Sequence, residues 1–286
     1  MSRTKEKKNG IEPFADALIE KFLPNEEGVD VSIALILPVY NCAEVIGTTL
    51  DSIKRQHYTN LEVVVVDAGS TDRTLEIVSS YHTLISRIYT ITEWNLYDMI
   101  NRGIALISAE YVSVIMPGSV YLSDHVFYMV AKFVLENAAP DLIYFGSIQR
   151  DRKKNSKILN APLRLDLLVK GIYPTNFTGC VFKTDLFEKI GKFDTRLKAR
   201  GGFDIFCRFA KEKALRSVRI DRVLVDADYT PLTIANPVRI FADIFSILHT
   251  HFGLRSAFKW FLGINHLIVI KMLWKNLKVN LFKKRS

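Results

Sequence analysis

The sequence predicts an α/β fold in which a mostly parallel sheet is flanked by helices and followed by a basic helical extension at the C-terminus. From Val31 onward, apolar runs of strand length alternate with stretches of helical periodicity, as in parallel strands joined by helices. The 286 residues suffice for one large domain with a buried core. After Pro237 the pattern becomes helical and rich in lysine and arginine, which defines the extension.

This pattern divides the chain into three parts. Residues 1–30 are predicted to form an N-terminal helical extension, because apolar residues recur there at helical spacing before a proline-to-glycine break. Residues 31–236 are predicted to form the main domain, with a first half at 31–148 and a second half at 149–236. Residues 237–286 are predicted to form a basic amphipathic helical tail.

The elements of the main domain follow from length and periodicity. Short runs rich in β-branched residues predict strands at 32–37, 61–67, 88–91, 111–115, 141–145 and 178–182. Apolar residues at a period near 3.6 predict helices at 43–56, 72–81, 97–108 and 124–137. The polar, basic stretch 149–160 is expected to be a mobile loop.

The charge is strongly positive, with 39 Lys and Arg against 30 Asp and Glu. Such an excess suits nucleic acid, a membrane surface or an anionic ligand such as a sugar nucleotide. The excess lies at the C-terminus, where nine basic residues but only Asp243 follow Pro237. The tail's aromatic and leucine positions either pack as core or meet an anionic membrane leaflet. Nucleic acid is the least favoured of these partners.

The cysteines and the termini predict a cytoplasmic protein. Cys42, Cys180 and Cys207 are odd in number and far apart, so neither a disulfide framework nor a zinc site is indicated. The basic start of the chain is followed by acidic residues, which does not fit a secretory signal. The uncharged stretch 260–270 is shorter than the roughly 20 residues that span a bilayer. We therefore expect a soluble protein, or one peripheral on the inner face of the membrane.

Two loops follow the first two predicted strands. Pro38 fixes the backbone before Tyr40 and Asn41, and about 26 residues later Asp67 and Gly69 leave the second strand. Each loop alone is also an ordinary turn, with a strand-end aspartate as its cap. In a parallel βαβ unit, however, both loops lie at the same edge of the sheet, where ligands bind. Together they predict a nucleotide site.

Three segments carry a resemblance to a known family. They read PVYN at 38–41, DAGSTD at 67–72 and YDMINRGIA at 97–105. They resemble the first half of a family 2 glycosyltransferase, in the subgroup that assembles bacterial capsule, exopolysaccharide and lipopolysaccharide. The resemblance implies a GT-A type, Rossmann-like fold, a nucleotide-sugar donor and a glycan or lipid-linked acceptor. It also implies nucleoside contacts from Pro38, Tyr40, Asn41, Asp67, Gly69 and Asn101.

The sequence departs from the family at its metal-binding motif. Where aspartates would hold Mn²⁺ or Mg²⁺ against the donor diphosphate, residues 116–119 read Met-Pro-Gly-Ser. Hard cations need carboxylate oxygens, so no residue is assigned as a metal ligand. Ser119 and Arg200 are assigned to the diphosphate region. Asp124 is either a remote ligand or, more simply, a helix cap.

A second departure concerns the catalytic base. Residues 178–194 resemble the family's acceptor-side segment, and Gly202 occupies the position of the base. Glycine cannot deprotonate an acceptor hydroxyl. Asp204 is the candidate that replaces the base, although it could also cap a helix or pair with Arg208. Besides a glycosyltransferase, the sequence therefore allows a catalytically degenerate binding or scaffold protein, or a nucleic-acid binder that uses the tail.

Overall fold

The computed structural model describes residues 28–150, 156–228 and 237–263. The chain divides into a short unit, Met1–Asp30, and a second unit, Val31–Ser286. The predicted N-terminal helix and the tail from residue 264 onward lie outside the described residues. The described helices and strands belong to the second unit.

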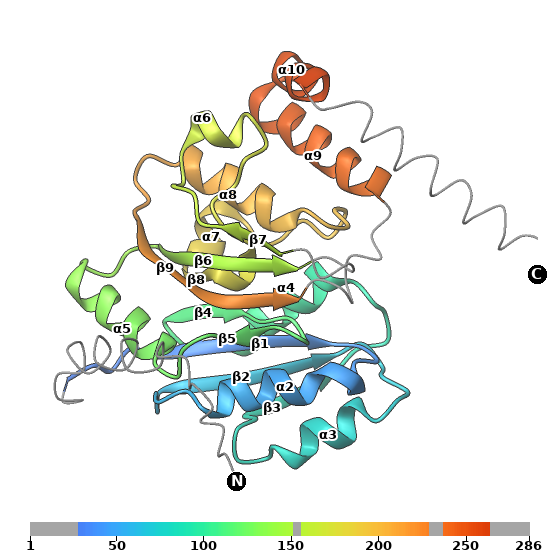
Figure 1. The fold of residues 1–286 in the computed structure, drawn as a ribbon, viewed down its shortest axis with the longest axis vertical. Coiled ribbons are helices and arrows are strands. Elements are labelled where there is room, and N and C mark those ends of the chain that lie inside the picture. Colours follow the sequence, from blue (N-terminus) through green and yellow to red (C-terminus); the bar gives the residue numbers. More distant parts are fainter. Residues whose placement is uncertain (1–27, 151–155, 229–236, 264–286) are drawn as a thin grey trace, which may run out of the picture. The chain divides into compact units, whose positions relative to one another are not determined.

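The centre of this unit is a mixed sheet with the strand order β3-β2-β1-β4-β8-β6-β9-β5 among the described residues (Figure 1). Its first half is parallel, as predicted, and its second half contains antiparallel pairs. β7 lies off this path and pairs with β6. The strands are β1 Ile33–Val39, β2 Leu61–Asp67, β3 Arg87–Thr90, β4 Tyr111–Val114, β5 Val120–Tyr121, β6 Leu142–Arg150, β7 Ser156–Leu159, β8 Cys180–Lys183 and β9 Ser217–Asp228.

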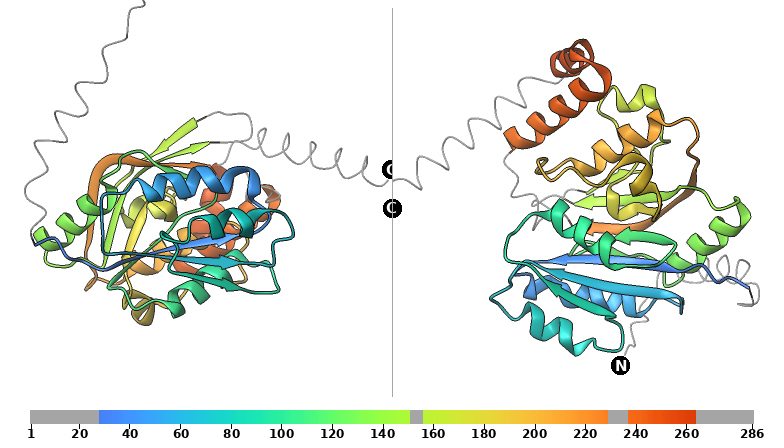
Figure 2. Two further views of the ribbon diagram at one scale, coloured as in Figure 1. Left: turned by 90° about the horizontal axis from the view of Figure 1, so that it is seen from below. Right: turned by 180° about the vertical axis from the view of Figure 1, so that it is seen from behind.

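Helices cover both faces of the sheet, and Figures 1 and 2 show α2 and α4 on opposite sides of β1. Alternate residues of β1 and β2, such as Ile36 and Val64, join one core cluster with α4, α8 and α9, as the two-residue period of a strand requires. The helices are α2 Ala43–Lys54, α3 Thr74–Ser80, α4 Leu96–Leu106, α5 Val126–Glu136, α6 Leu165–Leu168, the 3₁₀ turn η1 Phe177–Gly179, α7 Leu186–Ile190, α8 Gly201–Lys211, α9 Pro237–Phe252 and α10 Leu254–Gly263.

The first strand runs through Pro38 instead of ending before it. Proline has no N–H for a sheet ladder. The Ile36 carbonyl accepts a hydrogen bond from Ile115 on the β4 side, and the alternation of the ladder turns the Pro38 nitrogen to that same side. The last β4 residue in register is Val114, opposite Ile36. Pro38 therefore lies beyond the end of the β1–β4 pairing, where its missing N–H removes no ladder hydrogen bond. On the other side, β1 stays paired with β2 up to Val39.

Two other expectations were wrong in detail. The ends of the stretch predicted to be a loop at 149–160 are strand, because β6 continues to Arg150 and pairs with β7 as a hairpin. Asp124 does not cap α5, whose N-cap residue is His125. The Asp124 carboxylate instead lies 3.3 Å from the Arg55 guanidinium.

The start of the C-terminal extension belongs to the core. α9 packs on α8 and α10 packs on α9. Ile244, Ile247 and Leu248 of α9 are buried in the same cluster as the central sheet. Residues 237–252 and 254–263 are thus helical and pack on the main domain, whereas the basic extension as a whole stays a prediction.

At Gly103, helix α4 packs closely against Ile36 of β1. A Cβ at this position would lie 2.6 Å from Cγ2 of Ile36, whereas Gly47 of α2 has no neighbour within 4 Å of a Cβ. We expect Gly103→Ala to lower the free energy of unfolding by about 1–3 kcal/mol through overpacking. Gly47→Ala should leave it unchanged or raise it by up to about 1 kcal/mol. Urea denaturation of the two variants tests this, and equal effects would contradict the close packing.

Candidate functional site

The carboxyl ends of β1 and β2 form a tightly hydrogen-bonded edge. Asn41 has a positive φ of 44°, which asparagine tolerates better than most residues. Its side-chain oxygen accepts hydrogen bonds from the backbone N–H of Thr71 at 2.8 Å and Asp72 at 3.3 Å, and its own N–H donates to Ser70. Asn41 therefore joins the two predicted loops, which lie side by side as the sequence indicated.

Asp67 ends β2 with a buried carboxylate. It accepts hydrogen bonds from the backbone N–H of Gly69 at 3.0 Å and of Ser70 at 3.1 Å, and from the Ser70 hydroxyl. Gly69 has a φ of 79°, a conformation that favours glycine. In this structure Asp67 holds the turn that carries Gly69, in agreement with the capping interpretation.

An exposed aromatic pair stands at this edge. Tyr40 and Trp94 are 43% and 45% exposed, and their ring centroids lie 5.5 Å apart. Large aromatic side chains left in solvent offer a surface on which a planar base can stack. Sequence reasoning missed Trp94, although its aromatic ring directly before the cap of α4 was a usable signal.

Helix α4 connects this edge to the second half of the domain. Asn95 caps the helix by accepting from the N–H of Tyr97 and Asp98, and its amide donates to the Thr195 carbonyl. The buried Tyr97 hydroxyl accepts from the Gly201 N–H at 2.7 Å. Asn101, assigned above to the nucleoside, hydrogen-bonds both backbone groups of Phe193 at 2.8 and 2.9 Å. These contacts position the start of α8.

The loop at 116–119 does not fit a divalent metal. Gly118 has a φ of 86° and donates its N–H to Thr49 at 2.8 Å. Ser119 is fully buried, and its hydroxyl has no hydrogen-bond partner among the described residues. Val120 pairs in register with Asp226, but the Arg150 guanidinium binds both oxygens of that carboxylate. One neutral hydroxyl and one ion-paired acid do not supply the oxygen ligands that such an ion requires.

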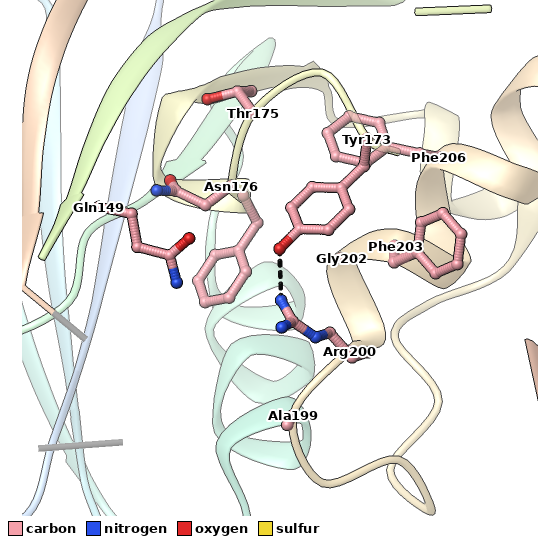
Figure 3. A pocket seen from close by; sticks show the side chains of 10 residues that line it. Gln149, Tyr173, Thr175, Asn176, Ala199, Arg200, Gly202, Phe203 and Phe206 are labelled. Carbon is pink, nitrogen blue, oxygen red and sulfur yellow. Dashed lines mark hydrogen bonds between the residues drawn. The ribbon is translucent and has the colours of Figure 1, made fainter. Parts of the chain in front are cut away.

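A pocket lies at the start of α8 (Figure 3). Its cavity volume is about 30 Å³, roughly twice what one water molecule needs. Figure 3 shows Arg200 and Tyr173 pointing toward one another, with Gln149 and Asn176 on the other side. Its described lining consists of Gln149, Tyr173, Thr175, Asn176, Phe177, Ala199, Arg200, Gly202, Phe203 and Phe206.

The charge in this pocket comes from Arg200. Its guanidinium donates a hydrogen bond to the Tyr173 hydroxyl and lies 5.4 Å from the centre of the Tyr173 ring. The buried Nε has no hydrogen-bond partner within the described ranges. The sequence had grouped Arg200 with Ser119, whereas the structure places it beside Gly202, where the family would have its base.

Asp204 is not among the described residues that line this pocket. Its carboxylate accepts from Arg208 at 2.9 Å and lies 2.7 Å from Nε2 of His251 on α9. Burial opposes the charged form, but His251 and Arg208 outweigh it and hold the pKa of the Asp204 carboxyl below its ordinary value of 3.8. A carboxylate held in this way is a weak base. Of the three interpretations of Asp204, the structure shows the pairing with Arg208, and the N-cap residue of α8 is Arg200.

The loop before α8 is fixed by Asp243 of α9. One oxygen of this buried carboxylate accepts the backbone N–H of Lys198, Ala199 and Arg200 at 3.0, 2.8 and 3.2 Å. Three donors on one oxygen form a strong charge-assisted cluster. Nothing in the sequence distinguished Asp243 except that it was the sole acid in a basic segment.

The carboxyl edge of β1 and β2 and the pocket at the start of α8 are thus two regions joined by α4. The first contains Tyr40, Asn41, Asp67 and Gly69 of the predicted set, and the second contains Arg200. A mostly parallel α/β sheet with polar loops at its carboxyl edge is an arrangement that commonly binds nucleotides. In agreement, residues 34–191 match the model of the family described as glycosyl transferase family 2. The chain belongs to this family.

Relatives with curated descriptions support the assignment. A PGL/p-HBAD biosynthesis glycosyltransferase of Mycobacterium bovis is 29% identical over 188 residues, covering 64% of this chain and 71% of that protein. An uncharacterized glycosyltransferase of Rickettsia typhi is 27% identical over 187 residues, and the match spans 63% of this chain and 58% of that protein. The chain therefore matches little more than half the length of the Rickettsia relative.

Solved structures share the fold. TarS of S. aureus, residues 1–349, has a TM-score of 0.63 at 17% identity, covering 83% of this chain and 73% of that one. The mannosyltransferase PcManGT of Pyrobaculum calidifontis, in complex with GDP-Man and Mn²⁺, has a TM-score of 0.56 at 18% identity and covers 93% of this chain and 87% of that one. At these identities the likeness shows the GT-A fold alone.

The Asp204 cluster yields a prediction about stability. A carboxyl whose pKa is lower in the folded state stabilises the fold above its unfolded pKa, near 3.8, and loses that effect as the pH falls through the folded value. Asp204→Asn should lower the free energy of unfolding by about 2–3 kcal/mol at pH 7. The difference from the natural protein should shrink below about pH 4.

Asp194→Asn is the matched control for this substitution. Asp194 pairs with Arg196, whose side chain is 88% exposed, so its loss should change stability by less than about 1 kcal/mol. Denaturant unfolding between pH 3 and 7 provides the comparison. Equal, pH-independent effects of both variants would show that the Asp204 cluster does not stabilise α8 against α9.

Proposed function

We propose that this protein transfers a sugar from a nucleotide-sugar donor to a cell-surface glycan or lipid-linked acceptor. The observation that carries the proposal is the exposed Tyr40 and Trp94 pair beside the Asp67 turn, at the carboxyl edge where parallel sheets bind nucleotides. Family membership supports it. So do structural neighbours in complex with UDP-GlcNAc and with GDP-Man.

In this proposal the base of the donor stacks on Tyr40 or Trp94, and the Asp67 turn receives the ribose. The diphosphate then points from the edge of β1 toward the end of β4, where Ser119 lies. The residues there are neutral, so they neither chelate a metal nor repel the phosphates. The sugar would face the pocket at the start of α8.

A non-catalytic binding or scaffold protein is the main alternative. It too would keep the donor edge, and it explains the lack of acids at 116–119 and Gly202. Release of a nucleoside diphosphate that depends on an acceptor separates the two proposals, because a scaffold binds without turnover. A nucleic-acid binder would instead show affinity that falls steeply with salt.

The donor edge makes a prediction about nucleotide binding. A panel of nucleoside diphosphates and their sugars, each with and without Mn²⁺, should include one that raises the unfolding temperature equally in both conditions. Saturation at about 100 times the dissociation constant adds roughly 2.7 kcal/mol. Tyr40→Ala and Trp94→Ala should each weaken this ligand by about 5- to 100-fold, the effect of one lost base stack.

Tyr81→Ala is the control, since Tyr81 ends α3 and donates to Asp51 outside the proposed edge. It should leave nucleotide affinity within about twofold. If no nucleotide stabilises the natural protein, the proposed donor site is wrong. A shift that requires Mn²⁺ would show that other residues rebuild a metal site.

We also propose that α10 rests on an anionic membrane surface, where a lipid-linked acceptor would be found. Leu254, Phe258 and Leu262 share one side of α10 and are 51%, 49% and 68% exposed. Exposed Arg255 and Lys259 flank this side. No helix in the described part of the chain is long and apolar enough to cross a bilayer. A helix with an apolar side and a basic flank suits the plane of the interface.

Vesicle binding of the full chain tests this surface. The double variant Leu254→Asp with Leu262→Asp should reduce co-sedimentation with phosphatidylserine-containing vesicles at least about tenfold, because each inserted leucine contributes roughly 1.5–3 kcal/mol. The control double variant, Leu135→Asp with Ile158→Asp, adds the same charge at sites 53% and 63% exposed on α5 and β7. An equal loss of vesicle binding in both double variants would contradict the proposal. So would vesicle binding that is the same with neutral lipids as with phosphatidylserine.

A further inference from the structure

The guanidinium of Arg200 is a partly buried charge without an acid. Among the described residues, no Asp or Glu oxygen lies within ion-pair distance of it. Its side-chain partner is the neutral Tyr173 hydroxyl, and its Nε has none. A charge withdrawn from water is costly unless it is paired. The geometry therefore suits an anion that arrives from outside.

The backbone around Arg200 is held so that the charge stays in the pocket. Asp243 binds the backbone N–H groups of residues 198–200 on the α9 side. Tyr97 binds the next N–H, that of Gly201, from α4. Two buried side chains on different helices thus fix the backbone from which Arg200 extends. Such preorganisation lowers the cost of binding a charged group.

The same pocket has no base. None of its described lining residues is acidic, and Gly202 stands at the position of the family's base. The nearest acid along α8, Asp204, is bound by Arg208 and His251 outside the lining. A neutral hydroxyl acceptor needs its proton removed as it attacks. An acceptor that is already an anion does not.

We propose that the acceptor attacks through the oxygen of a phosphate monoester, which the pocket binds by Arg200. This inference rests on the proposed glycosyl transfer and specifies its acceptor. Arginine binds phosphate oxygens through several donors at once. Gln149 and Asn176, on the facing side of the pocket, add uncharged amides that do not repel an anion.

The transfer balances without a proton acceptor. A deprotonated phosphate oxygen supplies the electron pair of the new bond to the anomeric carbon. The bond between that carbon and the donor diphosphate breaks, and its electron pair leaves with the nucleoside diphosphate. The products are a glycosyl phosphate and a nucleoside diphosphate. Because a phosphate monoester has a second pKa near 6, its nucleophilic form is abundant at pH 7.

Acceptor competition with the purified full chain tests the proposal. The donor is the nucleotide sugar that raises the unfolding temperature, and the acceptors are farnesyl phosphate, farnesol and inorganic phosphate. We expect farnesyl phosphate to be glycosylated at least about 100-fold faster than farnesol. Faster transfer to inorganic phosphate than to farnesyl phosphate would identify a free anion in place of a lipid headgroup as the source of the phosphate.

The outcomes distinguish this inference from the proposed function. If no nucleotide sugar binds, the proposed donor site is contradicted, and so is the proposed acceptor. Transfer to farnesol or to another hydroxyl acceptor, without transfer to either phosphate, overturns the inference and leaves glycosyl transfer standing. Donor binding without transfer to either phosphate also overturns it.

Two pairs of variants test the pocket. Arg200→Gln should raise KM for farnesyl phosphate at least about tenfold while nucleotide-sugar affinity stays within about twofold. Arg55→Gln, which removes an equal charge from the far end of α2, should change neither. Weaker donor binding in Arg200→Gln would assign this residue to the donor diphosphate and overturn the inference.

Gly202 supplies the second pair. A Cβ there would lie 3.2 Å from the Phe177 ring, so Asp and Asn cause the same crowding and differ in charge. With farnesyl phosphate, kcat/KM of Gly202→Asp should be at least about tenfold below that of Gly202→Asn, because a carboxylate repels the phosphate. If Gly202→Asp instead gains turnover with a hydroxyl acceptor, the position is a lost base and the inference is wrong.

Discussion

The acceptance of three backbone N–H groups by the Asp243 carboxylate is the interaction on which the geometry of the pocket depends. These donors belong to residues 198–200, which have no strand or helix of their own to satisfy them. A buried carboxylate without them would be costly, and the loop without the carboxylate would lose its shape. Helix α9 is therefore physically part of the main domain, because its Asp243 holds the loop that precedes α8.

The two departures from the family have a consistent electrostatic effect. Residues 116–119 and Gly202 contain no acid. Asp226, opposite Val120, and Asp204, two residues after Gly202, are both bound by arginines. Arg200 keeps its charge unpaired among the described residues. An isolated loss of one acid would not produce this pattern.

Much of the fold followed from sequence because periodicity and turn chemistry are local. The boundaries of β2 and the side-by-side loops at Asn41 and Asp67 were predicted correctly, and the resemblance correctly named the family. What sequence could not supply were contacts between distant segments. The Tyr97 hydroxyl meets Gly201 across 104 positions, and His251 meets Asp204 across 47. Spacing contains no signal for either pair.

The buried polar groups beside the pocket argue for a working site over a degenerate scaffold. Ser147, Thr175 and Asn176 are buried and linked by hydrogen bonds of 3.0 and 2.9 Å. Apolar side chains of similar shape would fill this space without the cost of desolvating polar atoms. Asn176 is the exception, since its oxygen also accepts from Gly179 and so supports the turn before β8. Thr175 and Asn176 of this network also line the pocket that contains the Arg200 guanidinium, where we propose that a polar ligand binds.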